Sequence, residues 1–146
     1  MKKLNEFKAE FPSMSANESF ARSCVTCFAA QLDPTLTELN DIKTAVSEAV
    51  TNCIVHAYPG CIGRVVIKCR ILNGDVFELS VKDNGVGIED IALARTPLYT
   101  GGNPEERAGM GFSIMESFTD EMRVRSRPGR GTVVVLRKRI GGGSGK

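Results

Sequence analysis

Asp83-Asn84-Gly85-Val86-Gly87-Ile88 follows a run in which Phe77, Leu79 and Val81 alternate with polar residues. This alternation predicts a strand with one buried face, so the glycines come at the end of a strand. Asp83 supplies a hydrogen-bond acceptor, and the glycines lack the side chains that would keep the backbone away from a planar ligand. The stretch therefore predicts a binding loop at a strand end, although one G-x-G alone is weak support for any ligand.

Segments on both sides of this loop predict an α/β domain. The predicted strands cover residues 7–11, 65–71, 77–81, 122–124 and 132–137. The predicted helices cover residues 15–33, 35–58, a short stretch ending near 95, and 109–118. Asn73-Gly74 between two alternating runs is the turn signal of a hairpin. Residues 96–108 are rich in Gly, Pro and charge, and are a candidate mobile lid.

Each of the first two predicted helices has a start signal and an apolar stripe. Ser15-x-x-Glu18 and Thr35-x-x-Glu38 both fit the capping box. The stripe predicted to be buried on the first helix consists of Phe20, Cys24, Cys27, Phe28 and Leu32. On the second helix it consists of Leu39, Ile42, Val46, Ala49, Val50, Cys53 and Ala57.

The bulk numbers limit the classes of function. At 146 residues and 42% hydrophobic content, we expect one domain at residues 1–140, followed by a disordered Gly-rich tail at 141–146. A net charge of +2 argues against nucleic-acid binding, and the basic residues 137–139 are expected to form a solvated strand edge. The chain lacks the roughly 20-residue apolar run of a membrane span, so we expect no membrane partner and a cytoplasmic location. The cysteines are then interpreted as reduced thiols, and Cys24-x-x-Cys27 as no metal site because no second ligand pair follows.

The second predicted helix carries Glu48, Asn52 and His56 at intervals of four, which places them on one stripe. Asn52 offers a neutral oxygen to Mg²⁺, an ion that takes few protein ligands where phosphates and water complete its shell. A carboxylate one turn away could accept a proton. All three could also be ordinary solvated residues.

Two further motifs follow the loop. Gly109-Met110-Gly111 is predicted to open a helix, whose start offers backbone N–H groups to phosphate. Gly131-Thr132 adds a hydroxyl at the start of the last strand.

The order of the motifs EAVTN, DNGVGI, GMGF and GT resembles the GHKL superfamily of ATPases and kinases. Within it, the segments NESFAR (residues 17–22), AQLDPTLTEL, SEAVTNCIVHAY, PLYT, ERAGMGF and IMESF (residues 114–118) resemble the sporulation anti-sigma F factors, a family of serine kinases. The resemblance runs from about residue 5 to residue 138. It implies a two-layer α+β sandwich of the Bergerat ATP-binding type, with a mixed, mainly antiparallel sheet.

The resemblance also implies roles for the matching residues. The nucleotide set is Asn52 for Mg²⁺, Asp83 for the adenine amino group, Thr132 beneath the adenine, Gly85 and Gly87 around the base, Gly109, Met110 and Gly111 for the phosphates, and Arg107 at the lid hinge. Glu48 would be the general base, and Arg22 would contact the protein partners.

The implied function is a homodimeric anti-sigma factor that binds and inhibits sigma F. With Mg-ATP it would phosphorylate a serine of the anti-anti-sigma factor. Two alternatives stay open, namely a non-catalytic, ATP-dependent sigma-binding module and an anti-sigma kinase for a different, stress-type sigma factor. The lid reads Thr-Gly-Gly-Asn-Pro at residues 100–104 where relatives often carry a lysine, which predicts weaker phosphate binding there. A phospho-acceptor role for His56 is disfavoured because no separate acceptor hairpin is predicted.

Overall fold

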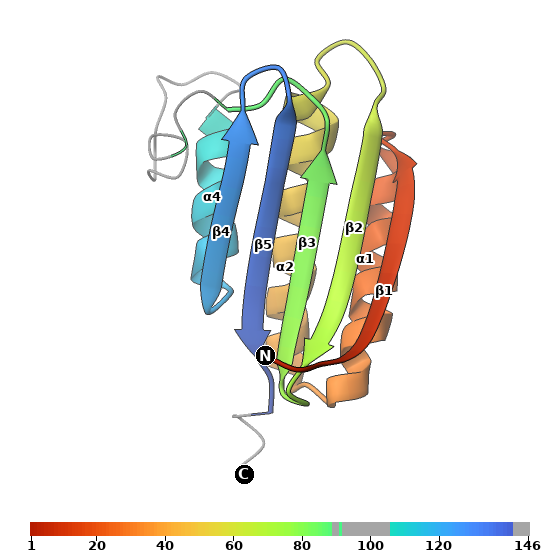
Figure 1. Ribbon diagram of the computed structural model, residues 1–146, viewed down its shortest axis with the longest axis vertical. Helices are drawn as coiled ribbons and strands as arrows, with labels where there is room; N and C mark the ends of the chain where they lie inside the picture. The colour runs from red at the N-terminus through yellow and green to blue at the C-terminus, as the bar shows by residue number, and fades with distance from the viewer. Residues whose placement is uncertain (89–90, 92–105, 142–146) are drawn as a thin grey trace.

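The computed structural model describes residues 1–88, 91 and 106–141, with the backbone alone for 106–110. One sheet forms a layer, and the helices pack on one of its faces (Figure 1). The strands are β1 (Lys3–Pro12), β2 (Arg64–Leu72), β3 (Val76–Asp83), β4 (Glu121–Arg127) and β5 (Gly131–Arg139). The helical elements are α1 (Ala16–Ala29), the 3-10 turn η1 (Ala30–Leu32), α2 (Leu36–Asn52), the π segment η2 (Cys53–Ala57) and α4 (Glu106–Ser117). These elements confirm the two-layer sandwich.

The strand order is β1-β2-β3-β5-β4, and each neighbouring pair is antiparallel. The described sheet is thus antiparallel throughout, where a mixed, mainly antiparallel sheet was expected. The reason is that β5 turns back from β4 and lies between β4 and β3, which run in the same direction without touching (Figure 1). This arrangement leaves the ends of β3 and β5 side by side, with Asp83 opposite Thr132.

The core lies between the sheet and the helices, and it confirms most of the predicted stripe of α2. Ile42, Val46, Ala49, Val50, Cys53 and Ala57 are buried, while Leu39 is partly exposed. For α1 the predicted stripe is wrong at Phe20, which is 53% exposed, and at Cys27, which is exposed. Ala21, Val25 and Ala29 face the core instead, and these small side chains let the helix lie close to its neighbours.

The two predicted capping boxes have different outcomes. At Thr35 the box is present, because the Glu38 N–H donates to Thr35 Oγ1 (3.1 Å) and the Thr35 N–H donates to Glu38 Oε1 (2.8 Å). At Ser15 it is absent, since the Ser15 backbone is already helical and its side chain makes no cap. An N-cap side chain reaches back to the helix only from the extended region.

The hairpin turn is confirmed, with Asn73 and Gly74 both at positive φ (57° and 89°), as a type I′ turn requires. Two boundaries differ from the prediction. Helix α4 begins at Glu106, so its first turn takes in the end of the predicted lid, and the rest of the lid lies outside the described residues. Gly141, assigned to the disordered tail, is buried and its N–H donates to Glu38 Oε2 (3.2 Å); residues 142–146 lie outside the described residues.

Candidate functional site

The helical geometry changes directly after Asn52. Helix α2 ends at that residue and continues as the π segment η2, whose turns are wider. Glu48 and Asn52 both lie on α2, one turn apart, whereas His56 lies beyond the end of α2 in the π segment. Single π turns occur frequently at functional sites, where they redirect side chains.

Glu48 and Asn52 meet at α4, opposite Gly111. A Cβ atom on Gly111 would lie 3.2 Å from Asn52 Oδ1 and 3.2 Å from Glu48 Oε2. Residues from two separate parts of the sequence thus come together as the motifs predicted.

The Asn52 amide has an unused polar group. Its Nδ2 atom is buried and has no hydrogen-bond partner among the described residues. Leaving such a group unsatisfied costs about 1 to 3 kcal/mol, a cost that a bound ligand or water would remove. An amide and a carboxylate close together suit Mg²⁺, which prefers oxygen ligands. The residues present therefore fit an Mg²⁺-phosphate group.

Gly111 lies within α4 and not at its start, which corrects the prediction. In an α-helix the N–H of the sixth residue bonds to a carbonyl four residues earlier, so the Gly111 N–H is not a free donor. Gly109 falls in the first turn, where N–H groups lack helical partners. What Gly111 supplies is the space beside Glu48 and Asn52. Nothing is described of the side chains of Arg107 and Met110.

Asp83 is a buried acceptor, only 5% exposed. The Gly85 N–H donates to Asp83 Oδ1 (2.9 Å), and the Cys53 thiol donates to Asp83 Oδ2 (3.5 Å). Burial raises the pKa of the Asp83 carboxyl, while these bonds and one from the Thr132 N–H oppose the rise. The carboxylate is therefore held in one orientation. Sequence reasoning placed Cys53 in the core only; the one available signal was its position next to Asn52.

The glycines of the loop serve a purpose that the motif did not reveal. A Cβ on Gly85 would overlap the carbonyl of Ala57, and one on Gly87, whose φ is 77°, would overlap the carbonyl of Arg127. The Val86 N–H donates to the same Ala57 carbonyl (2.9 Å). Gly85 and Gly87 therefore let the loop lie against the chain's own backbone at the end of η2 and at the β4–β5 turn.

Tyr58 and Ser126 are site-supporting residues that sequence reasoning missed. The Tyr58 hydroxyl donates to the Arg64 carbonyl (2.6 Å) and accepts from the Asn84 N–H (2.7 Å), which fixes the loop beside Asp83. Ser126 Oγ lies 2.7 Å from Thr132 Oγ1 and accepts from an N–H of the same loop. The bond from Asn84 to Tyr58 spans 26 residues, the bond from Ile88 to Ser126 spans 38, and the Ser126–Thr132 contact depends on the β4–β5 pairing, so no local motif signals them.

Arg22 lies apart from the loop, on the outer side of α1. Its side chain is 41% exposed and 3.6 Å from Glu18. It borders a groove of about 570 Å³ between α1 and α2, which Glu48 also lines. The remaining lining residues are Ser23, Thr26, Cys27, Lys43, Thr44 and Ser47. The structure thus brings the predicted partner contact and the predicted base to one groove.

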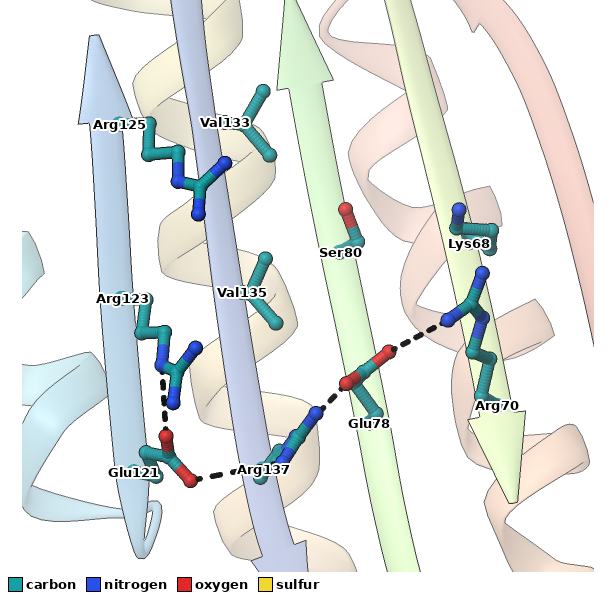
Figure 2. Close-up of a pocket in the computed structure, with 10 residues that line it drawn as sticks. All are labelled: Lys68, Arg70, Glu78, Ser80, Glu121, Arg123, Arg125, Val133, Val135 and Arg137. Atoms are coloured by element: carbon teal, nitrogen blue, oxygen red, sulfur yellow. Dashed lines mark hydrogen bonds and ion pairs between the residues drawn. The ribbon is translucent and has the colours of Figure 1, made fainter. Parts of the chain in front are cut away.

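A second hollow, of about 330 Å³, lies on the face of the sheet away from the helices and contains none of the predicted site residues (Figure 2). Figure 2 shows a row of ion pairs across it: Arg123–Glu121 (2.9 Å), Glu121–Arg137 (3.9 Å), Arg137–Glu78 (2.8 Å) and Glu78–Arg70 (3.9 Å). Lys138 pairs with Asp41 and Arg139 with Asp75. The basic residues 137–139 are therefore ion-paired within the chain and not simply solvated.

All five cysteines are free thiols. Within the described ranges no helix is both long and apolar enough to cross a membrane.

Residues 11–138 match the family described as histidine kinase-like ATPase domain. The anti-sigma F factor of Thermoanaerobacter sp. (strain X514) is 55% identical over 141 residues, covering 97% of this chain and 98% of the relative. That of Halalkalibacterium halodurans is 52% identical over 136 residues, covering 93% of each.

A solved structure shares the fold. The RsbU and RsbW domains of Rv1364c from Mycobacterium tuberculosis align with a TM-score of 0.69 at 18% identity, over 94% of this chain and 33% of that chain. The family match and the full-length relatives lead to one conclusion: the chain belongs to the anti-sigma F factors and carries their histidine kinase-like ATPase domain.

Proposed function

We propose that this chain binds and inhibits sigma F and, with Mg-ATP, phosphorylates a serine of an anti-anti-sigma factor. The observation that carries the catalytic part is the meeting of the Glu48 carboxylate and the Asn52 amide beside Gly111, between α2 and α4. The relatives' name, anti-sigma F factor, supports the sigma partner. A homodimer in the cytoplasm completes the proposal and is supported by the resemblance to the same family.

The nucleotide would lie along the end of α2. Asp83 would accept a hydrogen bond from the adenine amino group, with Thr132 supporting the base, because their ends of β3 and β5 are paired. Gly85 and Gly87 would shape the loop around the base. Asn52 would hold Mg²⁺, which would neutralise charge on the phosphates. At α4, backbone N–H groups of the first turn at Gly109, together with Met110 and the cation Arg107, would complete the phosphate contacts, and Gly111 would leave the space that they need.

Glu48 would activate the acceptor serine. The serine Oγ forms a bond to the γ-phosphorus as the bond from that phosphorus to the bridging oxygen breaks, and the electron pair leaves on ADP. The hydroxyl proton passes to the Glu48 carboxylate. A serine hydroxyl is a weak nucleophile at neutral pH, and a positioned base contributes about 10² to 10⁴ in rate.

The protein partners would bind at the groove between α1 and α2. Arg22 provides an exposed guanidinium at this groove, and Lys43 adds a second cation. A partner segment with an acidic side chain near Arg22 would lie in the same groove as Glu48, which could then reach an incoming hydroxyl.

Glu48→Gln tests the proposal. The variant keeps the size of the side chain and removes the base, so we expect near-normal Mg-ATP binding and single-turnover phosphorylation slowed by about 10² or more. Glu116→Gln removes an exposed carboxylate of α4 and serves as the control. Asn52→Ala should instead abolish the Mg²⁺ dependence of ATP binding in calorimetry.

The outcomes separate the parts of the proposal. Equal transfer rates for Glu48→Gln and wild type would remove Glu48 from the chemistry. If wild type with Mg-ATP formed no phosphoserine on an anti-anti-sigma protein but still bound sigma F, the catalytic part would be wrong. The chain would then be a non-catalytic binding module.

A further inference from the structure

Cys53 is a buried thiol that contacts the carboxylate of Asp83. It is the first residue of η2, directly after Asn52, and is only 3% exposed. Its Sγ lies 3.5 Å from Asp83 Oδ2, while the Gly85 N–H holds the other oxygen, Oδ1, at 2.9 Å. The two carboxylate oxygens are thus fixed from two different elements, the end of α2 and the loop after β3.

We infer that Cys53 is a positioning residue for base recognition, whose thiol orients the Asp83 carboxylate toward the exocyclic amino group of adenine. The inference rests on the proposed function, because it requires Asp83 to contact the adenine.

The hydrogen-bond inventory of Asp83 supports this role. An ionised carboxylate has about four acceptor positions. The Gly85 N–H takes a position on Oδ1 and the Cys53 thiol takes one on Oδ2. Each oxygen keeps an open position for a donor from a ligand, and the 6-amino group of adenine is such a donor. Without the thiol, Oδ2 would have two open positions and the carboxylate could rotate about its bond to Cβ.

The chemical nature of the thiol also fits. An ionised carboxylate can only accept hydrogen bonds, so in the contact with Asp83 Oδ2 the Cys53 thiol is the S–H donor. A thiol is a weak donor that does not neutralise the carboxylate. It can therefore orient Asp83 and leave its charge available to the ligand.

A competing interpretation is that Cys53 only fills space, since free cysteines are among the most frequently buried residues. It does belong to the core between α2 and the sheet. The two interpretations differ in one measurable respect. A space filler supports the pocket for every nucleotide, whereas a positioning residue matters only for a base that carries the amino group.

The experiment compares two nucleotides on three variants. Calorimetry with Mg²⁺ measures ATP and purine riboside triphosphate, which is ATP without the 6-amino group. For Cys53→Ala we expect ATP affinity to fall about tenfold, the low end for a hydrogen bond to a charged group, with the affinity for the analogue unchanged. Cys53→Ser restores a donor and should recover part of the loss. Cys69→Ala removes another buried thiol, on β2, and should alter neither affinity.

Thermal unfolding of each variant shows whether that variant is folded under the conditions of the binding measurements. An equal loss for both nucleotides in Cys53→Ala would overturn the inference and make Cys53 a space filler. So would unchanged ATP affinity, since Asp83 would then be held without the thiol. If Cys53→Ala does not fold, the test is the ratio of the affinities of Cys53→Ser for ATP and for purine riboside triphosphate. The serine hydroxyl is a donor at the same position, so a Cys53→Ser protein that no longer prefers ATP would exclude the positioning role. Wild type that binds neither nucleotide would overturn the proposed function itself.

Discussion

Replacing Gly111 by alanine should separate stability from nucleotide binding. In a helix interior, alanine is favoured over glycine by about 1 kcal/mol. The added methyl would lie 3.2 Å from Asn52 Oδ1 and 3.2 Å from Glu48 Oε2, so both side chains must move by a few tenths of an ångström. Turning them away from their preferred rotamers costs about 0.5 to 1.5 kcal/mol each. The free energy of unfolding should therefore fall by no more than about 2 kcal/mol.

Binding should respond much more strongly to Gly111→Ala. Mg²⁺ requires ligand oxygens at about 2.0 to 2.1 Å with near-octahedral geometry, and productive sites tolerate errors of only about 0.5 Å. The methyl would occupy the space that Asn52 and Glu48 share. We expect Mg-ATP affinity to fall by about tenfold or more, which corresponds to about 1.4 kcal/mol.

The assay for Gly111→Ala is urea unfolding combined with calorimetry of Mg-ATP. Ser117→Ala, at the exposed end of the same helix, raises helix propensity without approaching the site and is the control. A stable Gly111→Ala protein with wild-type Mg-ATP affinity would refute the reasoning, because the ligand could then not lie in the space beside Asn52.

Three further perturbations test other parts of the structure. Gly85→Ala should lower the free energy of unfolding, measured in urea, by about 3 kcal/mol, because the added methyl would overlap the Ala57 carbonyl and only backbone movement can relieve the overlap. A decrease in that free energy of less than about 1 kcal/mol would contradict this. The pKa of Asp83 in the folded state is raised above its ordinary 3.8, so the free energy of unfolding of wild type should fall relative to that of Asp83→Asn as the pH rises from 3.8 through the folded pKa, and the difference should be constant above it. A rise in the stability of wild type relative to Asp83→Asn over this pH range would contradict the direction of the shift. Arg22→Ala should weaken sigma F binding by about 2 kcal/mol and leave Mg-ATP affinity unchanged, whereas Arg64→Ala, an exposed arginine paired with Glu10, should affect neither; a joint loss of both affinities in Arg22→Ala would make Arg22 structural.

Periodicity in the sequence was enough to predict the sheet and the long helix. The alternation on β2 and β3 places one face in the core, and Asn73-Gly74 fixes their register, so these elements need only local information. The stripe of α1 failed for a physical reason. Hydrophobicity selects Phe20, but close packing against α2 and the sheet selects the small residues Ala21, Val25 and Ala29, and packing distance has no signature in hydropathy.

The candidate site was predictable in its residue types but not in its supporting contacts. A helix spacing of four was sufficient to pair Glu48 with Asn52. The contact of Cys53 with Asp83 depends on the switch from α to π geometry after Asn52, and no start or stop signal in the sequence marks that switch. The need for glycine at position 85 is also not visible in the sequence, because it arises from the Ala57 carbonyl at the end of that π segment.

Helix α2 has its core contacts and its polar site residues on different faces. Because of this, some substitutions change the site without changing the stability of the core. Val46, Ala49 and Val50 are buried against the sheet, whereas Glu48 and Asn52 are only partly buried and face α4. Substitutions at the two polar positions can therefore change chemistry without opening a cavity in the core. Cys53, the first residue after α2, combines the two roles, since it is buried in the core and also contacts Asp83. Its replacement must cost some stability whatever its role, so only the comparison of two bases separates orientation of the carboxylate from packing.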